Sequence, residues 1–128
     1  MRVFEVMRSG KANPVVKASA RLSDVVVVMT NTPGRPGAAN VVDDAGLLVG
    51  IFTDGDLRRS LQKGVDMRAT RITEVMTGGP RTIGPDKLAA EAVEIMERFK
   101  VNQLLVVDQE QRLVGALNMH DLFRGKVI

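Results

Sequence analysis

The stretch Gly50 to Asp56, GIFTDGD, contains two residues whose types and spacing suit the binding of a phosphorylated ligand. If a helix begins here, the Thr53 hydroxyl and the free backbone amides of the first turn can surround a phosphate, and the helix dipole favours its charge. The Asp56 carboxylate can then accept hydrogen bonds from ribose hydroxyls. Thr53 and Asp56 also fit a capping box, in which each side chain satisfies the other residue's backbone amide. The residues alone leave both interpretations open.

A second stretch repeats this chemistry with one change. Asn118 and Asp121 keep the spacing of a capping box, but an amide replaces the threonine hydroxyl. Capping is therefore expected at both places, and ligand binding is favoured at the first. Arg59 and Arg124 follow at matching positions on the next helical turn, where a guanidinium can bind a phosphate through two hydrogen bonds. The alternative for both arginines is a solvated or ion-paired surface position.

Three further residues are expected near the ligand sites beside these two stretches. His120 directly precedes Asp121, as Gly55 directly precedes Asp56. Near a helix start, this histidine is either an exposed polar residue or a ligand contact. Lys100 and Asn102 lie between a predicted helix and the following strand. The predicted ligand-binding residues are therefore Thr53, Asp56, Arg59, Lys100, Asn102, Asn118, His120, Asp121 and Arg124.

The same inventory gives little support to catalysis. The chain has one histidine, no cysteine and no serine in a nucleophile-elbow motif, so neither a catalytic triad nor a metal cluster is expected. Asp43 and Asp44, or Asp54 and Asp56, could form an acid–base pair, but Asp43 and Asp44 follow a predicted strand and fit a turn better. We expect this chain to be no enzyme, with no catalytic residue, no metal and no cofactor.

An internal repeat positions these residues. Val41 to Arg59, VVDDAGLLVGIFTDGDLRR, recurs as Val106 to Arg124, VVDQEQRLVGALNMHDLFR, a shift of 65 residues (106 minus 41). VFEVM near the N-terminus likewise answers ITEVM in the second half. Half-length units that each expose an apolar face must bury that face against each other. The sequence therefore predicts two repeats, residues 1–64 and 65–128, packed sheet against sheet as a pseudo-twofold pair.

Each repeat is predicted to have the order β-α-β-β-α, which makes the fold class α+β. In the second copy, Gly84 fits an N-cap and Pro85 the first position of a helix. Apolar residues then recur at helical spacing, and two strands with a short turn follow, at Gln103 to Val107 and Leu113 to Leu117. A short helix is expected to lead into each repeat, at Phe4 to Met7 and Thr73 to Met76, and another to close the second near Asp121.

The first copy contains a conflict between propensity and the repeat. Val25 to Val28 is a run of four β-branched residues and favours a strand. Alignment with the second copy favours a helix, and packing commonly overrides propensity. We predict a helix, followed by a Gly- and Pro-rich loop within Thr30 to Asn40.

Composition limits the class of protein. A net charge of +3, spread over 18 basic and 15 acidic residues with few aromatic rings, is poor material for a nucleic-acid surface. No apolar run approaches the roughly 18 residues of a membrane span, and no signal-peptide core precedes the first repeat. We expect a cytoplasmic protein that binds neither nucleic acid nor membrane.

The motif Gly50 to Asp56 and the repeat around it resemble a tandem pair of cystathionine-β-synthase (CBS) domains, also called a Bateman module. The longer string GIFTDGDLRRSLQKG, with ITEVMT and VVDQEQRLVG after it, is similar to the C-terminal part of bacterial D-arabinose-5-phosphate isomerases. This resemblance implies that the parent protein carries an N-terminal sugar-isomerase domain. It also implies a role in Kdo synthesis for lipopolysaccharide.

The resemblance leaves three classes of function to compare. The favoured one is a regulatory module that senses an adenine or cytidine nucleotide or a nucleotide sugar, with CMP-Kdo as the specific candidate. The second is a purely structural dimerisation module that keeps the catalytic domains assembled. In either case we expect a homodimer, because a partner pair can cover the helices with apolar residues at Val25, Val26, Met29, Leu57 and Leu61. The third, a free-standing catalyst, has no support in the residues.

Overall fold

The computed structural model describes residues 1–128, which form two compact units. Unit 1 consists of Met1–Gly10 together with Arg81–Ile128, and unit 2 is Lys11–Pro80. The predicted boundary between residues 64 and 65 separates the sequence repeats, but it does not separate these units. The difference arises because the segment leading into each repeat packs with the other repeat. No helix is both long and apolar enough to span a bilayer.

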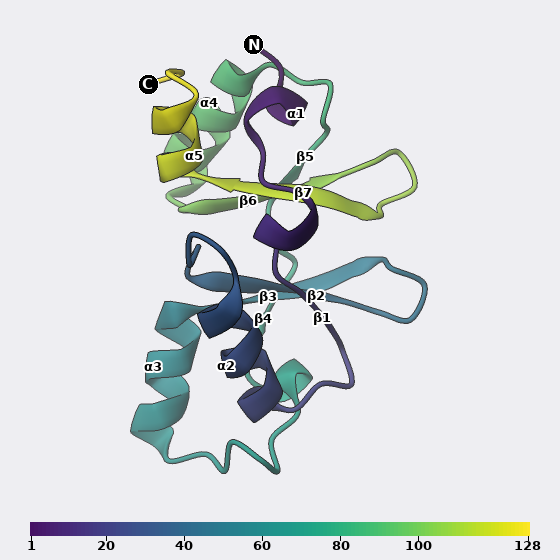
Figure 1. The fold of residues 1–128 in the computed structure, drawn as a ribbon, viewed down its shortest axis with the longest axis vertical. Helices are drawn as coiled ribbons and strands as arrows, with labels where there is room; N and C mark the ends of the chain where they lie inside the picture. Colours follow the sequence, from purple (N-terminus) through teal and green to yellow (C-terminus); the bar gives the residue numbers. More distant parts are fainter. The chain divides into compact units, whose positions relative to one another are not determined.

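Unit 2 is a four-stranded sheet with helices on one face (Figure 1). The strand order is β1-β2-β3-β4, in which β1 and β2 are parallel and the other neighbours antiparallel. In chain order the elements are β1 (Val15–Lys17), α2 (Leu22–Asn31), β2 (Ala38–Val42), β3 (Leu48–Thr53), α3 (Asp54–Lys63), the 3-10 helix η2 (Ile72–Glu74) and β4 (Thr77–Gly78). The predicted β-α-β-β-α order is confirmed.

Unit 1 repeats this plan with a three-stranded sheet in the order β5-β6-β7. Its elements are α1 (Val3–Val6), β5 (Thr82–Ile83), α4 (Ala89–Phe99), β6 (Gln103–Val107), β7 (Leu113–Asn118) and α5 (Met119–Arg124). Arg8 pairs with Ala116 of β7 as a single antiparallel bridge, at the edge where unit 2 has β4. A 3-10 turn, η1 (Gly10–Ala12), lies where the chain passes from unit 1 to unit 2.

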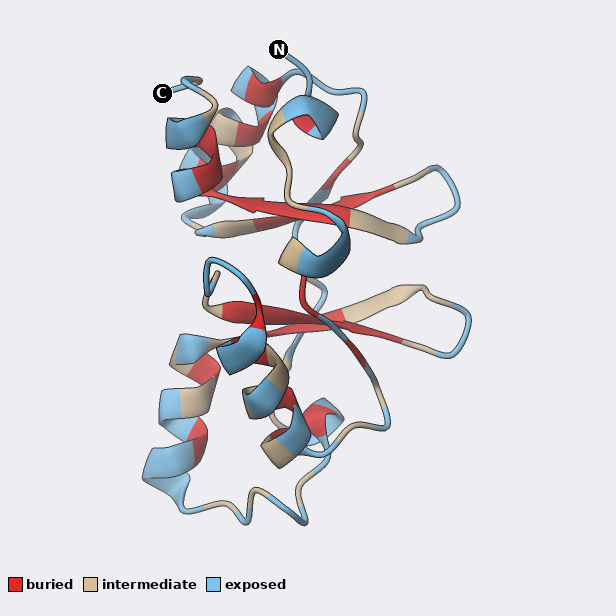
Figure 2. Ribbon diagram, viewed as in Figure 1, coloured by how far each residue is buried: buried red, intermediate tan, exposed pale blue.

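Each unit has its own apolar core between its sheet and its helices, as the buried positions in Figure 2 show. The valine run of the first repeat is helical, as predicted. Leu22, Val25 and Met29 of α2 are buried, whereas Val27 is 57% exposed. Burial of one helical stripe therefore outweighs the preference of valine for strands.

The predicted start of the second long helix is wrong. Gly84 and Pro85 lie in a turn, in which the Lys87 amide donates to the Gly84 carbonyl, and α4 begins at Ala89. The N-terminal segment accounts for this late start. The Val3 amide donates to the Lys87 carbonyl (2.8 Å) and the Ala89 amide donates to the Met1 carbonyl (2.8 Å). These bonds hold Leu88 in an extended conformation just before α4.

Unit 2 contains the same arrangement. The Leu22 amide donates to the Thr70 carbonyl and the Ile72 amide donates to the Ala20 carbonyl, both at 2.9 Å. Each lead-in segment thus hydrogen-bonds to the chain just before the long helix of its own unit. The predicted lead-in helices are present but short, as α1 (Val3–Val6) and η2 (Ile72–Glu74).

Candidate functional site

The motif in unit 2 lies where β3 passes into α3, with Thr53 as the N-cap. The Asp56 amide donates to Thr53 Oγ1 (3.2 Å), and the Thr53 amide donates to Asp56 Oδ2 (3.0 Å). The predicted capping box is therefore confirmed. The Thr53 hydroxyl also donates to Asp56 Oδ2 (3.1 Å), so its one proton already has a partner.

Asp56 is buried and has two more partners besides Thr53. Arg59 Nη2 donates to Asp56 Oδ1 (2.6 Å), while the Arg59 side chain is 62% exposed. The Thr77 hydroxyl lies 3.2 Å from Oδ1 and 3.4 Å from Oδ2 of the same carboxylate. A buried carboxylate is thus placed beside a solvent-facing guanidinium and a small hydroxyl, which a ligand with hydroxyl and phosphate groups can engage.

The equivalent site in unit 1 has the same capping box and a different environment. The Asn118 amide donates to Asp121 Oδ2 (2.8 Å), and the Asp121 amide donates to Asn118 Oδ1 (3.0 Å). Arg124 pairs with Asp121 Oδ1, as Arg59 pairs with Asp56. Arg8 adds a second guanidinium, with its Nε 2.9 Å from Asp121 Oδ2.

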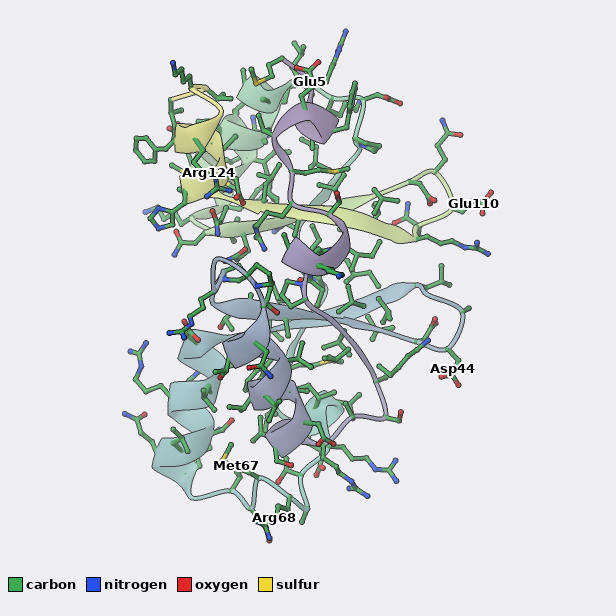
Figure 3. The ribbon with its side chains drawn as sticks, in the orientation of Figure 1. Glu5, Asp44, Met67, Arg68, Glu110 and Arg124 are labelled. Carbon is green, nitrogen blue, oxygen red and sulfur yellow. The ribbon has the colours of Figure 1, made fainter.

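The other predicted ligand-binding residues lie in unit 1 and are exposed. His120 is the second residue of α5. Lys100 ends α4 in a left-handed conformation (φ 54°), and Asn102 follows it just before β6. No side-chain hydrogen bond or ion pair joins any of these three to Asp121. Arg124 is seen in Figure 3 on α5.

Sequence reasoning missed Thr77 and Arg8. Thr77 belongs to the second repeat and contacts Asp56 in the first, and Arg8 belongs to the first repeat and contacts Asp121 in the second. One observation could have identified them, because both directly follow the matching strings ITEVM and VFEVM. Alignment shows that they are equivalent, but it does not show which carboxylate each contacts. That depends on the exchange of lead-in segments between repeats.

A hollow of about 200 Å³ lies in unit 2 beside the motif rather than on it. Its lining includes Arg35, Gly37 and Asp54 together with apolar side chains of α2 and α3, but not Thr53, Asp56 or Arg59. It is smaller than the roughly 300 to 1,000 Å³ typical of ligand pockets. We therefore centre the candidate site on Asp56.

Of Asp43 and Asp44, considered as an acid–base pair, Asp43 has a structural role. Asp43 Oδ1 accepts hydrogen bonds from the amides of Ala45 and Leu47 (both 2.9 Å) and so closes the β2–β3 turn. Asp108 Oδ1 does the same in the β6–β7 turn, with the amides of Glu110 and Arg112. Asp44 and Glu110 lie out on these two turns (Figure 3).

Comparison with known proteins places this arrangement in a family. The CBS domain family matches residues 3–63 and 72–127. The chain is 45% identical over its 128 residues to arabinose 5-phosphate isomerase KdsD of Pseudomonas aeruginosa, covering 39% of that protein. It is 39% identical to KdsD of Escherichia coli (strain K12), covering 38% of it. The chain therefore spans well under half the length of these curated relatives.

Solved structures agree on the fold. The CBS domain protein PAE2072 from Pyrobaculum aerophilum, complexed with AMP, has a TM-score of 0.84 at 20% identity, over 95% of this chain and 90% of that one. The CBS domain pair of protein MJ0100, in complex with 5'-methylthioadenosine and S-adenosyl-L-methionine, has a TM-score of 0.84 at 21% identity, over 98% and 99%. With two family matches and two β-α-β-β-α units, this chain belongs to the CBS domain family as a tandem pair.

Proposed function

We propose that this chain is the regulatory module of an arabinose 5-phosphate isomerase and binds a nucleotide or nucleotide sugar beside Thr53 and Asp56. The identity to the KdsD proteins over the whole chain supports the first part. The AMP and S-adenosyl-L-methionine complexes of structural neighbours support a nucleoside ligand. The chain itself supplies no catalytic step in this proposal.

The observation that carries the proposal is the environment of Asp56. Its buried carboxylate is held by the Thr53 amide, and its Oδ1 is shared by Thr77 and the exposed Arg59. A ribose can replace the Thr77 hydroxyl with its own hydroxyls, and Arg59 can turn to a phosphate while it stays near Asp56. Each hydrogen bond that the ligand forms involves a charged group, and such a bond contributes about 1.5 to 3 kcal/mol.

Asp56→Asn tests this site. The variant keeps an oxygen that can accept from the Thr53 amide, so the helix cap persists, but it removes the charge that ribose and Arg59 share. We expect the affinity for nucleotide to fall by on the order of tenfold or more. Calorimetric titration with AMP, ATP, CMP and CMP-Kdo measures this.

Asp54→Asn is the matched control, because Asp54 is exposed, lies in the same first turn of α3 and lines the neighbouring hollow. The proposal requires that this change leave affinity nearly unaltered. Equal weakening by both substitutions would move the ligand to the hollow. Equal affinity of wild type and Asp56→Asn would reduce Asp56 to a helix cap.

CMP-Kdo is the specific ligand we propose. It is the activated end product of the pathway to which an arabinose 5-phosphate isomerase contributes, and so it suits feedback on a regulatory module. It also combines a cytidine ribose with a phosphate, the two groups that Asp56 and Arg59 are placed to bind. Tighter binding of CMP-Kdo than of CMP in the same titration would support this choice.

A structural homodimerisation module is the alternative, and one observation favours it. Leu61 on α3 and Val27 on α2 are both 57% exposed on the helices of unit 2. Val25 and Met29, also expected to meet a partner, are buried in their own unit and are not available. If none of the four nucleotides binds below millimolar concentration, this alternative replaces the sensing function.

A further inference from the structure

Arg8 and Thr77 occupy the same position in the two units. Thr77 pairs with Ile51 and Arg8 pairs with Ala116, and both partners directly follow the glycine of their motif strand. Each residue therefore pairs with the strand that leads into its motif, β3 or β7, at the same point. From there its side chain contacts the motif carboxylate, Asp56 or Asp121. One is a short neutral hydroxyl, and the other is a long cation.

The carboxylates of Asp56 and Asp121 consequently differ in how many charged groups donate to them. Asp56 faces a neutral Thr77 hydroxyl in addition to Arg59, whose side chain is mostly in solvent. Asp121 faces Arg8, whose side chain is only 10% exposed, in addition to Arg124. The Asp121 side chain is 1% exposed. Both of its oxygens are taken by charged donors, whereas the oxygens of Asp56 share one charged donor and two hydroxyls.

Charge reinforces this difference. The group formed by Asp56 and Arg59 is neutral, while that formed by Asp121, Arg8 and Arg124 carries one net positive charge. A buried ion pair resists removal of one partner, because the carboxylate left behind loses a compensating charge. Ribose hydroxyls are neutral, so they cannot replace the buried guanidinium of Arg8 as they can replace a threonine hydroxyl.

We infer that Arg8 closes the motif of unit 1 to a ribose, so that the chain binds one nucleotide, at Asp56. Arg8 and Thr77 are then the residues that determine which motif accepts ligand. This inference rests on the proposed nucleotide site. It adds a reason, independent of the missing hydroxyl at Asn118, why two similar motifs differ in occupancy.

An exchange of the two residues tests the inference by calorimetric titration of the whole chain with AMP, ATP, CMP and CMP-Kdo. Wild type is expected to bind one nucleotide per chain. Thr77→Arg brings a guanidinium to Asp56 and should weaken that binding by roughly a hundredfold, as expected when a ligand must displace an ion pair. Arg8→Thr should free Asp121 and add a second binding event.

Arg8→Lys is the control, because it keeps a cation at Asp121 and should keep a single event. Thr77 is exposed, so Thr77→Arg tests the inference even if Arg8→Thr unfolds in a thermal melt. Unchanged binding in Thr77→Arg, or a folded Arg8→Thr that still binds once, would overturn the inference. Two events in wild type would overturn it and leave the proposed function intact. No binding by wild type would reject the proposed function, and the inference with it, because the inference places the single binding event at Asp56.

Discussion

At the scale of single residues, Gly50 in β3 and Gly115 in β7 have a steric role. A Cβ added at Gly50 would lie 2.5 Å from Met76 Sδ and 3.0 Å from the Thr77 carbonyl oxygen. A Cβ at Gly115 would likewise lie 2.5 Å from Met7 Sδ and 2.9 Å from the Arg8 carbonyl oxygen. The lead-in segment passes so close to the motif strand that only a residue without a side chain fits between them.

Gly50→Ala should therefore destabilise the protein by about 1 to 3 kcal/mol, because the new methyl group meets backbone as well as a flexible sulfur. Gly78→Ala is the matched control. Gly78 pairs with Gly50 in the same ladder, yet a Cβ there would have no heavy atom within 4 Å. Urea unfolding of both variants measures the difference. Equal stabilities would show that Met76 and Thr77 simply move aside.

The residue scale is also where sequence reasoning was most accurate and most incomplete. The two capping boxes were predicted correctly, since a capping box depends only on neighbours within four positions. Arg8 was missed because its contact with Asp121 spans 113 residues. No local pattern contains such information, and the alignment of repeats points to Arg8 without pointing to its partner.

At the scale of elements, the repeat resolved what propensity could not. The strands at residues 103–107 and 113–118 have the predicted starts, because alternation and turn residues act locally. The helix over Val25–Val28 was predicted by comparison with the second copy and by the helical spacing of its apolar residues. The predicted start of α4 was wrong because hydrogen bonds with residues 1–4 hold Leu88 in an extended bridge after the turn at Gly84 and Pro85. The local pattern of Gly84 and Pro85 cannot report these bonds.

Helix α2 provides a test of that balance between propensity and packing. Val27 is exposed on a helix, where alanine is the better residue by up to about 0.7 kcal/mol. Val27→Ala should thus leave stability unchanged or raise it by a few tenths of a kcal/mol. Val25→Ala removes a fully buried side chain and should lower stability by roughly 1 to 3 kcal/mol. Thermal unfolding followed by circular dichroism compares the stabilities of the two variants. A clear loss of stability in Val27→Ala would argue that the segment is extended or that this helix face is covered.

At the scale of the whole chain, sequence repeats and compact units do not coincide. Val3 is fully buried in the core of unit 1, although it belongs to the first repeat. Ile72 is fully buried in the core of unit 2, although it belongs to the second repeat. The lead-in segments are thus exchanged, and each motif carboxylate is contacted by a residue from the other repeat. The internal repeat shows that the chain contains two copies of a pattern. It cannot show which copy a lead-in segment packs against.

Val3→Ala and Ile72→Ala test this exchange in the 128-residue chain. The first should lower stability by roughly 1 to 3 kcal/mol and the second by about 2 to 5 kcal/mol, because each empties part of a packed core. Hydrogen exchange assigns the loss to a unit, since amides follow the stability of the region that contains them. Val3→Ala should speed exchange mainly in residues 81–128, and Ile72→Ala mainly in residues 11–63. Phe4→Ala, at an exposed neighbouring position, should change neither. The opposite assignment, with Val3→Ala acting mainly on residues 11–63, would mean that each repeat folds with its own lead-in segment.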